Sequence, residues 1–189
     1  MTQEQIRKLF TETGVLQTGH FILTSGRHSS KYLQCARLLQ YPTAAEKACR
    51  ELAQNFKDME VQTVIGPALG GIIVSYEVAR ALDARALFAE RENGRMVLRR
   101  GFALKPGERV LVVEDVVTTG GSVKEVSEFV KSCGAEVLAV GALVDRSGGK
   151  VDFGVPSRYL LNLEVESYLP EECPLCAQGI PAEKPGSRS

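Results

Sequence analysis

Five apolar segments recur at an even interval through the chain from residue 61 onward, and they constrain the fold more than any other feature. Successive segments start 25, 24, 27 and 22 residues apart, and a glycine-containing loop and a helical pattern follow each of the early ones. The segments are apolar without alternation, which is typical of strands buried on both faces. They begin near Val61, Ala86, Val110, Val137 and Tyr159. This pattern predicts an α/β fold, a doubly wound and mostly parallel sheet.

The first 60 residues follow a different pattern. A capping-box pair and an apolar face predict a short helix over residues 2–13, and a three- and four-residue repeat predicts a second helix over 43–56. Between them, short β-rich runs flank the turn Ser25-Gly26-Arg27, which predicts a small strand pair. We expect this pair to form a hood over the main sheet.

Composition favours one domain over two. The chain has 189 residues, of which 44% are apolar, enough to fill one core. We expect a single domain over residues 1–169, with the hood in about 1–40. Residues 170–189 are polar and rich in Cys, Pro and Gly, and predict a loosely held tail.

Charge and hydropathy limit the partners. The 23 Lys and Arg balance the 23 Asp and Glu, so no overall basic field would attract nucleic acid. No segment is apolar over the length of a bilayer span, and the first residues lack the apolar core of a signal peptide. The sequence therefore predicts a cytoplasmic protein that binds neither nucleic acid nor membrane.

The five cysteines predict free thiols rather than disulfides, because their number is odd and no secretion signal precedes them. Cys173-Pro-Leu-Cys176 has the spacing of a metal knuckle. A structural zinc site uses four ligands, however, and the sequence contains neither a second C-x-x-C nor a nearby H-x-x-x-H. Free thiols are the favoured interpretation, and no protein metal site is predicted.

The stretch VLVVEDVVTTGGSV at residues 110–123 carries the strongest chemical signal. A buried strand ends in two adjacent carboxylates, Glu114 and Asp115, which suit the vicinal hydroxyls of a sugar. Hydroxyls and glycines over 118–122 then lead into a helix, an arrangement that suits a phosphate monoester. A plain turn and helix cap would explain TTGGS alone, but a cap needs no acidic pair. The spacing fits neither the Walker A motif nor the dinucleotide fingerprint.

This stretch resembles the ribose-5-phosphate signature of the type I phosphoribosyltransferases. FILTSGRHS near the N-terminus, GPALGG at 66–71 and the segment 144–146 narrow the resemblance to the orotate-specific branch, over about residues 1–165, in its compact bacterial form. The resemblance implies transfer of ribose 5-phosphate from phosphoribosyl pyrophosphate to orotate in pyrimidine synthesis. It also implies Mg²⁺ held mainly through the substrate, and a homodimer.

The family's residues carry over onto specific positions. Asp115 matches the acid nearest the reacting ring, and Thr118 would also face the base. The implied site for the ribose and its 5-phosphate comprises Glu114, Asp115, Val116, Val117, Thr118, Thr119, Gly120, Gly121 and Ser122. For orotate the implied residues are Thr118, Tyr32, Leu33, His28 and Arg146, the last of which would meet the carboxylate. A surface-turn histidine is an equal alternative for His28.

Two further loops are implied to contact the diphosphate. In the loop over 66–71, Ala68, Gly70 and Gly71 match the pyrophosphate loop, although a tight turn explains the glycines equally well. Leu69-Gly70 replaces the family's aromatic–lysine pair, so one cation is missing. Residues 89–101 match a mobile basic loop, where Arg91 is the implied catalytic residue and Arg95 a second candidate. A solvated hairpin turning at Asn93-Gly94 is the alternative.

Two rival functions remain open from the sequence. A transferase for a purine or another base would share the ribose-phosphate loop, but an uncharged base would leave Arg146 unpaired. A regulator that senses phosphoribosyl pyrophosphate and controls RNA or DNA would need a broad basic face, which the balanced charge does not provide.

Overall fold

The structure, a computed structural model, describes residues 1–23, 25–163 and 165–185. Its main sheet has six strands in the order β5-β4-β3-β6-β7-β8, and every neighbouring pair is parallel except β4 with β5. The predicted α/β class is therefore confirmed. The strands are β3 (Thr63–Pro67), β4 (Arg85–Glu92), β5 (Arg95–Val97), β6 (Arg109–Val117), β7 (Glu136–Asp145) and β8 (Ser157–Asn162).

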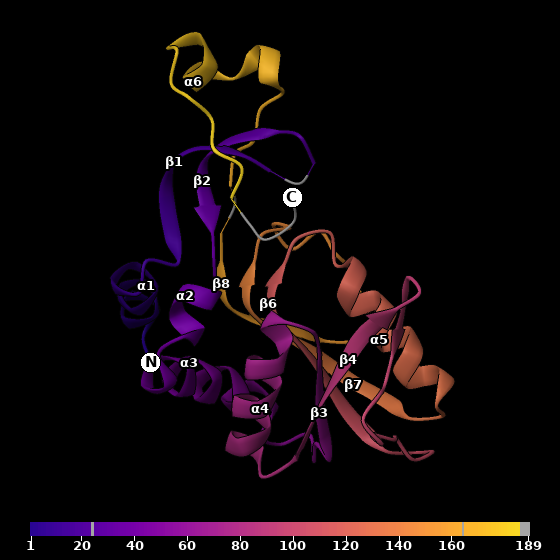
Figure 1. Cartoon of the computed structure of the whole chain (residues 1–189). Helices are drawn as coiled ribbons and strands as arrows, with labels where there is room; N and C mark the ends of the chain where they lie inside the picture. Colours follow the sequence, from indigo (N-terminus) through magenta and orange to yellow (C-terminus); the bar gives the residue numbers. More distant parts are fainter. Residues whose placement is uncertain (24, 164, 186–189) are drawn as a thin grey trace.

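Helices cover both faces of this sheet (Figure 1). On one side lie α1 (Gln3–Glu12), α3 (Pro42–Ala53) and α4 (Gly70–Leu82), and on the other lies α5 (Gly121–Ser132). Strand β6 shows why its sequence does not alternate: Leu111 and Val113 enter the first core, whereas Val110 and Val112 enter the second. Each of these side chains is fully buried, and burial of each contributes about 1.5–3 kcal/mol.

The helices at the N-terminus form as their sequences predict. Thr2 and Gln5 make the reciprocal capping box that starts α1, and α3 continues into the 3-10 turn η1 (Gln54–Phe56). A short helix, α2 (Ala36–Leu39), links the hood to α3.

Two strand–helix units depart from the predicted repeat: residues 93–108, between β4 and β6, form β5 and no helix, and the last connection lacks a helix as well. Residues 146–156, which join β7 to β8, contain no helix. Gly148, Gly149 and Gly154 all have positive φ in this connection. Such φ angles interrupt a right-handed helix, so the chain crosses between the parallel strands as a loop.

The hood is an antiparallel hairpin of β1 (Leu16–Ile22) and β2 (His28–Leu33), as predicted. The tail, with η2 (Pro170–Glu172) and α6 (Pro174–Ala177), lies against it (Figure 1). Just before the tail, Tyr168 pairs with His28 of β2 through two 2.8 Å backbone hydrogen bonds. Within the tail, Glu183 pairs with β1 through two more, also of 2.8 Å. Over its described part the tail is therefore bonded to the hood rather than loosely held; residues 186–189 lie outside the described residues.

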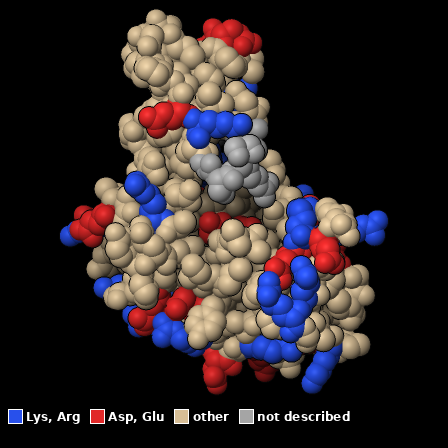
Figure 2. All heavy atoms as spheres, viewed as in Figure 1, with Lys and Arg blue, Asp and Glu red and all other residues tan. Residues whose placement is uncertain are grey.

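Charges of both signs are mixed over the face shown in Figure 2, as the balanced composition suggests. Among the described residues, no helix combines the length and the apolar character that a bilayer crossing requires.

Candidate functional site

The acidic pair lies at the carboxyl end of β6. Glu114 is 9% exposed and Asp115 is half-buried. The Asp115 N–H donates to Glu114 Oε1 at 3.0 Å, and the Val116 N–H donates to Asp115 Oδ1 at 2.8 Å. Burial, and then the neighbouring Asp115 carboxylate, raise the pKa of Glu114 well above its ordinary value. A cation or several hydroxyl donors bound here would stabilise the ionised form of Glu114 and lower its pKa.

The loop after this pair leads into the N-terminus of helix α5, whose N-cap residue is a glycine. Gly120 has a φ of 76° and, lacking a side chain, makes no side-chain capping hydrogen bond to the first turn. A Cβ at Gly120 would lie 2.5 Å from Val151 Cγ1, so packing and backbone angle both require glycine. A small cavity of about 60 Å³ lies here, lined by Glu114 and residues 116–123. The free amides of a first helical turn favour an anion at this position.

The glycine loop after β3 contacts the acidic pair directly. A Cβ at Gly70 would lie 2.4 Å from Asp115 Oδ2, so any larger residue here would displace the Asp115 carboxylate from its present position. Gly66 and Gly71 also lie against each other, since a Cβ at Gly66 would sit 2.5 Å from the Gly71 carbonyl oxygen. The Ala68–Leu69 peptide bond in this loop is cis. The loop over 66–71 and the acidic pair therefore belong to one site.

Arg146 reaches the same edge from the end of β7. Its N–H donates to the Val117 carbonyl at 2.8 Å, which fixes its backbone to the end of β6. Burial lowers the pKa of the half-buried guanidinium, and Tyr32 is close enough to oppose that change. Nε of Arg146 is buried without a hydrogen-bond partner among the described residues. Such a cation is prepared to bind a carboxylate.

Asp145 holds the Arg146 loop in shape, and the sequence analysis missed this role. The residue is fully buried. Its Oδ1 accepts from the Ser147 N–H at 2.8 Å and from the Ser147 hydroxyl at 2.6 Å, while Oδ2 accepts from the Gly149 N–H at 2.8 Å. The pattern Asp-x-Ser-Gly-Gly is a turn signal from which this role could have been predicted.

The hood contributes the fourth side of the site. Tyr32 is half-buried with its ring 5.7 Å from that of Phe21. Leu33 is buried in the core, so any contact it makes with a ligand comes from its backbone. The thiol of Cys35 lies 3.8 Å from the Asp115 carbonyl oxygen, and burial, followed by the nearby acidic pair, raises its pKa. The end of β2 is thus in contact with the end of β6.

Two arginines predicted for the site lie on a separate hairpin. Strands β4 and β5 pair antiparallel around the Asn93-Gly94 turn, as the hairpin alternative predicts. Arg91 Nη2 lies 2.7 Å from Glu125 Oε2 on α5, and Nη1 donates to the Gly94 carbonyl at 2.7 Å. Arg95 is exposed beside Glu125. Over the residues that the structure describes, the contacts of Arg91 are with α5 and the hairpin turn and not with the strand-end residues.

His28 also lies elsewhere, which corrects its assignment to the orotate pocket. The residue is 8% exposed, so the surface-turn alternative is wrong as well. Its Nδ1 lies 2.9 Å from His20 Nε2 and 3.2 Å from Cys176 Sγ. The side chain belongs to a group at the junction of the hood and the tail.

A larger cavity, of about 400 Å³, lies at the opposite end of the sheet. Two of the charged residues that line it are paired with each other: Arg85 Nη2 lies 2.6 Å from Glu108 Oε1, and Thr63 also hydrogen bonds to that carboxylate. Ligands of open α/β sheets bind beyond the carboxyl ends of the strands, so the smaller strand-end cavity is the candidate site.

These features define a class of protein. Residues 37–153 match the model of the "Phosphoribosyl transferase domain". This range contains the acidic pair of β6, the turn before α5 and the glycine loop after β3. That range covers more than half of the chain. The chain belongs to the phosphoribosyltransferase family.

Similar proteins point to one branch of this family. The chain is 62% identical to the orotate phosphoribosyltransferase of Desulforamulus reducens over 188 residues, which cover 100% of this chain and 98% of the relative. It is 63% identical to that of Thermotoga maritima over 183 residues, covering 97% and 98%. The crystal structure of orotate phosphoribosyltransferase from Aeropyrum pernix matches with a TM-score of 0.68 at 29% identity, covering 84% and 94%. The chain thus groups with the orotate phosphoribosyltransferases, as its sequence motifs predict.

Proposed function

We propose that this chain transfers ribose 5-phosphate from phosphoribosyl pyrophosphate to orotate, giving orotidine 5′-monophosphate and pyrophosphate in pyrimidine synthesis. One observation carries the reaction type: strand β6 ends in an acidic pair and leads directly into the uncapped start of α5. This strand end offers carboxylates for ribose hydroxyls and amides for the 5-phosphate within one short segment.

The remaining residues take roles that their positions support. The backbone and hydroxyls over 118–122 bind the 5-phosphate. The loop with Ala68, Gly70 and Gly71 contacts the diphosphate, since it lies against Asp115. No covalent nucleophile is needed, because departure of pyrophosphate leaves a ribosyl group of cationic character. The Asp115 carboxylate stabilises that charge as it develops.

Arg146 selects the base. Its half-buried guanidinium has an unpartnered Nε and would bind the orotate carboxylate, with Tyr32 and the backbone of Leu33 beside it. A purine would leave this cation unpaired in a partly buried position, which costs free energy. The observation therefore favours orotate over a purine. Thr118, exposed at the mouth of the site, faces the base.

The donor set at the strand end fits Mg²⁺. Two adjacent carboxylates are hard oxygen ligands, and the raised pKa of Glu114 is the kind that a bound cation lowers. Glu114 and Asp115 would hold the ion together with oxygens of the substrate. Bound Mg²⁺ supplies neutralisation of the diphosphate charge.

We further propose that the functional unit is a homodimer. Arg91 and Arg95 sit on the β4–β5 hairpin, where Arg91 is bonded to Glu125. In this proposal the hairpin serves the diphosphate of a neighbouring subunit, or of its own after Arg91 leaves Glu125. Crosslinking tests whether the chain forms a dimer. Mixing inactive Arg91→Ala and Asp115→Asn chains then tests which subunit the hairpin serves: activity returns in the mixed dimers only if Arg91 of one subunit acts with Asp115 of the other.

The decisive experiment is an absorbance assay with Mg²⁺, phosphoribosyl pyrophosphate and orotate, repeated with adenine, hypoxanthine and uracil. We expect orotate to be consumed and the other bases to remain. Turnover with a purine alone would overturn the choice of base while leaving the reaction type standing. Binding of phosphoribosyl pyrophosphate without turnover of any base would instead favour the sensing regulator.

A further inference from the structure

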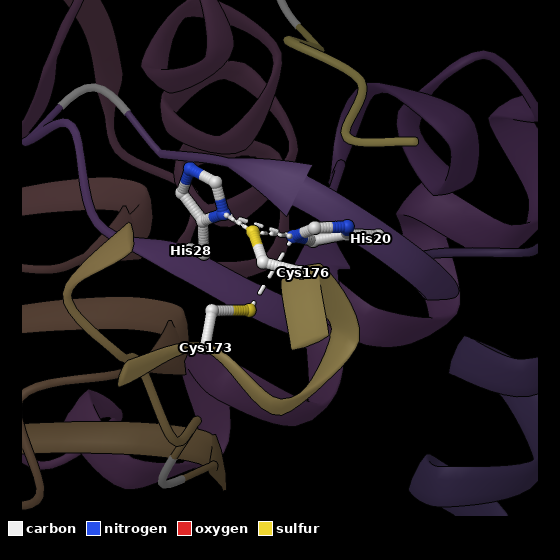
Figure 3. A group of neighbouring side chains, drawn as sticks. All are labelled: His20, His28, Cys173 and Cys176. Carbon is white, nitrogen blue, oxygen red and sulfur yellow. Dashed lines mark hydrogen bonds between the residues drawn. The ribbon is translucent and has the colours of Figure 1, made fainter. Parts of the chain in front are cut away.

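Four side chains from opposite ends of the chain converge at the junction of the hood and the tail. They are His20 and His28 of the β1–β2 hairpin, and Cys173 and Cys176 of the tail (Figure 3). One nitrogen or sulfur atom from each lies within 4.8 Å of all the others. Three of the residues are buried and Cys176 is exposed. Together they form a His₂Cys₂ cluster.

The spacing of these atoms matches one metal coordination sphere. His20 Nε2 lies 2.9 Å from His28 Nδ1, 3.4 Å from Cys173 Sγ and 3.7 Å from Cys176 Sγ, and His28 Nδ1 lies 3.2 Å from Cys176 Sγ. Tetrahedral zinc with bonds of about 2.0–2.3 Å to nitrogen and sulfur places its ligand atoms roughly 3.3–3.8 Å apart. Small shifts of the side chains would therefore seat a zinc ion among the four atoms.

The tautomer of His20 supports a metal rather than a simple hydrogen-bonded pair. Its Nδ1 lies 2.7 Å from the Ile180 carbonyl oxygen. A carbonyl only accepts, so Nδ1 carries the proton and a neutral ring has its lone pair on Nε2. That lone pair points at the other three atoms. A backbone carbonyl on the far nitrogen is the usual partner of a metal-bound histidine.

We propose that the His₂Cys₂ cluster is a structural zinc site that fastens the tail to the hood. Two thiolates and two neutral imidazoles balance the charge of Zn²⁺, and both thiol protons are released to solvent when the ion binds. All four coordination positions come from the protein, which is the pattern of a structural site. Beyond the ion, this junction is held by backbone bonds at Tyr168 and Glu183.

The position of the cluster gives the zinc a consequence for the hood. His28 begins β2, and the same strand ends at Leu33, next to Tyr32 and close to the acidic pair. Zinc bound at His28 would fix the first residue of β2 and so help to hold Tyr32 and Leu33 at the other end of this strand. Loss of zinc would therefore loosen the hood, while the strand-end residues keep their places in the main sheet.

The test is the metal content of full-length, tag-free protein grown with zinc and purified without chelators. We expect about one zinc per chain by mass spectrometry, falling at least about 10-fold in Cys173→Ser/Cys176→Ser. Cys133→Ser, a partly exposed thiol outside the cluster, is the matched control and keeps its zinc. Chelation of the wild type should lower Tm by roughly 5–10 °C, and added zinc should restore it.

Replacement of the ion by Co²⁺ in the wild-type protein covers the case in which the double variant does not fold. A tetrahedral site with two thiolates gives intense visible bands and a sulfur-to-cobalt charge-transfer band. An octahedral or sulfur-free spectrum would overturn the proposal. So would wild-type protein without zinc after incubation with the ion, a Cys173–Cys176 disulfide in freshly isolated protein, or full zinc content in the double variant. Zinc content does not depend on which base the enzyme uses. A negative result in the zinc test therefore leaves the proposed function untouched, and a negative orotate assay leaves the zinc proposal untouched.

Discussion

The strand-end site and the His₂Cys₂ cluster are built in opposite ways. The acids and the turn before α5 come from one continuous segment, residues 114–122, attached to a strand that is fully buried over residues 110–113. The second joins histidines and cysteines that are 145 to 156 positions apart, through a two-stranded hairpin and a tail. A contiguous motif needs only its own strand to be placed correctly, whereas the cluster needs the whole fold to bring its ligands together.

This difference suggests that the strand-end site contributes mainly to catalysis and the cluster mainly to stability. The strand-end site carries groups that are costly for folding, such as the buried Glu114 carboxyl, and its anchor is the main core. The cluster lies outside that core and would fasten a peripheral element. We therefore expect strand-end substitutions to change turnover more than Tm, and cluster substitutions to change Tm more than turnover.

The largest expected effect is that of Asp115→Asn. Loss of the carboxylate removes charge stabilisation at the reacting sugar, and kcat/KM should fall about 10²–10³-fold. Tm should stay within a few degrees of the wild type, because the side chain is outside the apolar cores. Steady-state assays and calorimetry measure the two quantities, with Asp58→Asn, an exposed aspartate, as the control. Near-normal turnover would show that Asp115 does not stabilise the reacting sugar. A large loss of Tm would contradict the expected difference between the strand-end site and the cluster.

Substitution of Arg146 should have the next largest effect. Arg146→Ala removes a charged hydrogen-bond donor to the orotate carboxylate, and the KM for orotate should rise roughly 10–100-fold. Arg146→Lys should recover part of the loss, because lysine keeps the charge but not the planar fork. The exposed Arg158→Ala serves as the control. An unchanged orotate KM with weaker binding of phosphoribosyl pyrophosphate would contradict the assignment.

The strand-end site was predictable because its signals are local. Burial of β6 on both faces, the acidic pair and the turn glycines are all present within residues 110–122. The parallel order of the strands then placed Arg146 and the loop over 66–71 at the same edge. Local pattern also predicted the hood hairpin and both N-terminal helices.

The features that sequence reasoning missed depend on long-range pairing. The hairpin places His20 and His28 on neighbouring strands, and the tail carries its cysteines to them only because it bonds to both sides of that hairpin. No sequence spacing predicts that these histidines and cysteines come together. Arg91 illustrates the same limit: the Asn93-Gly94 hairpin was one of the predicted alternatives, but the ion pair of Arg91 with Glu125 on α5 joins residues 34 positions apart and has no local signal.

Gly70→Ala sharpens the comparison with a purely steric change. An added Cβ would lie 2.4 Å from Asp115 Oδ2, so either the carboxylate or the loop must move. Displacement of a reacting group lowers rate strongly, and we expect kcat/KM to fall roughly 10-fold. Ile73→Ala, on the exposed side of the same helix, is the control. Wild-type activity in Gly70→Ala would show that this contact has no part in catalysis.

The smallest effect expected is a gain of stability in Glu114→Gln. Burial raises the pKa of Glu114 in the folded chain, so the folded state binds more protons than the unfolded state between the two pKa values. The contribution of this group is therefore present in acid and is lost as pH rises above the ordinary carboxyl pKa. Glutamine cannot ionise, so the Tm advantage of the variant should be near zero in acid and grow with pH.

At pH 8 we expect the Glu114→Gln variant to melt about 2–4 °C above the wild type, the shift that about 1 kcal/mol produces in a domain of this size. Its turnover should fall, because the carboxylate is lost to ribose and cation. Glu128→Gln, on the exposed face of α5, should show no pH-dependent difference. A Tm difference that shrinks as pH rises would reverse the assigned sign. A variant that gains stability and loses activity, set against cluster variants that lose more stability than activity, would separate the two regions by experiment.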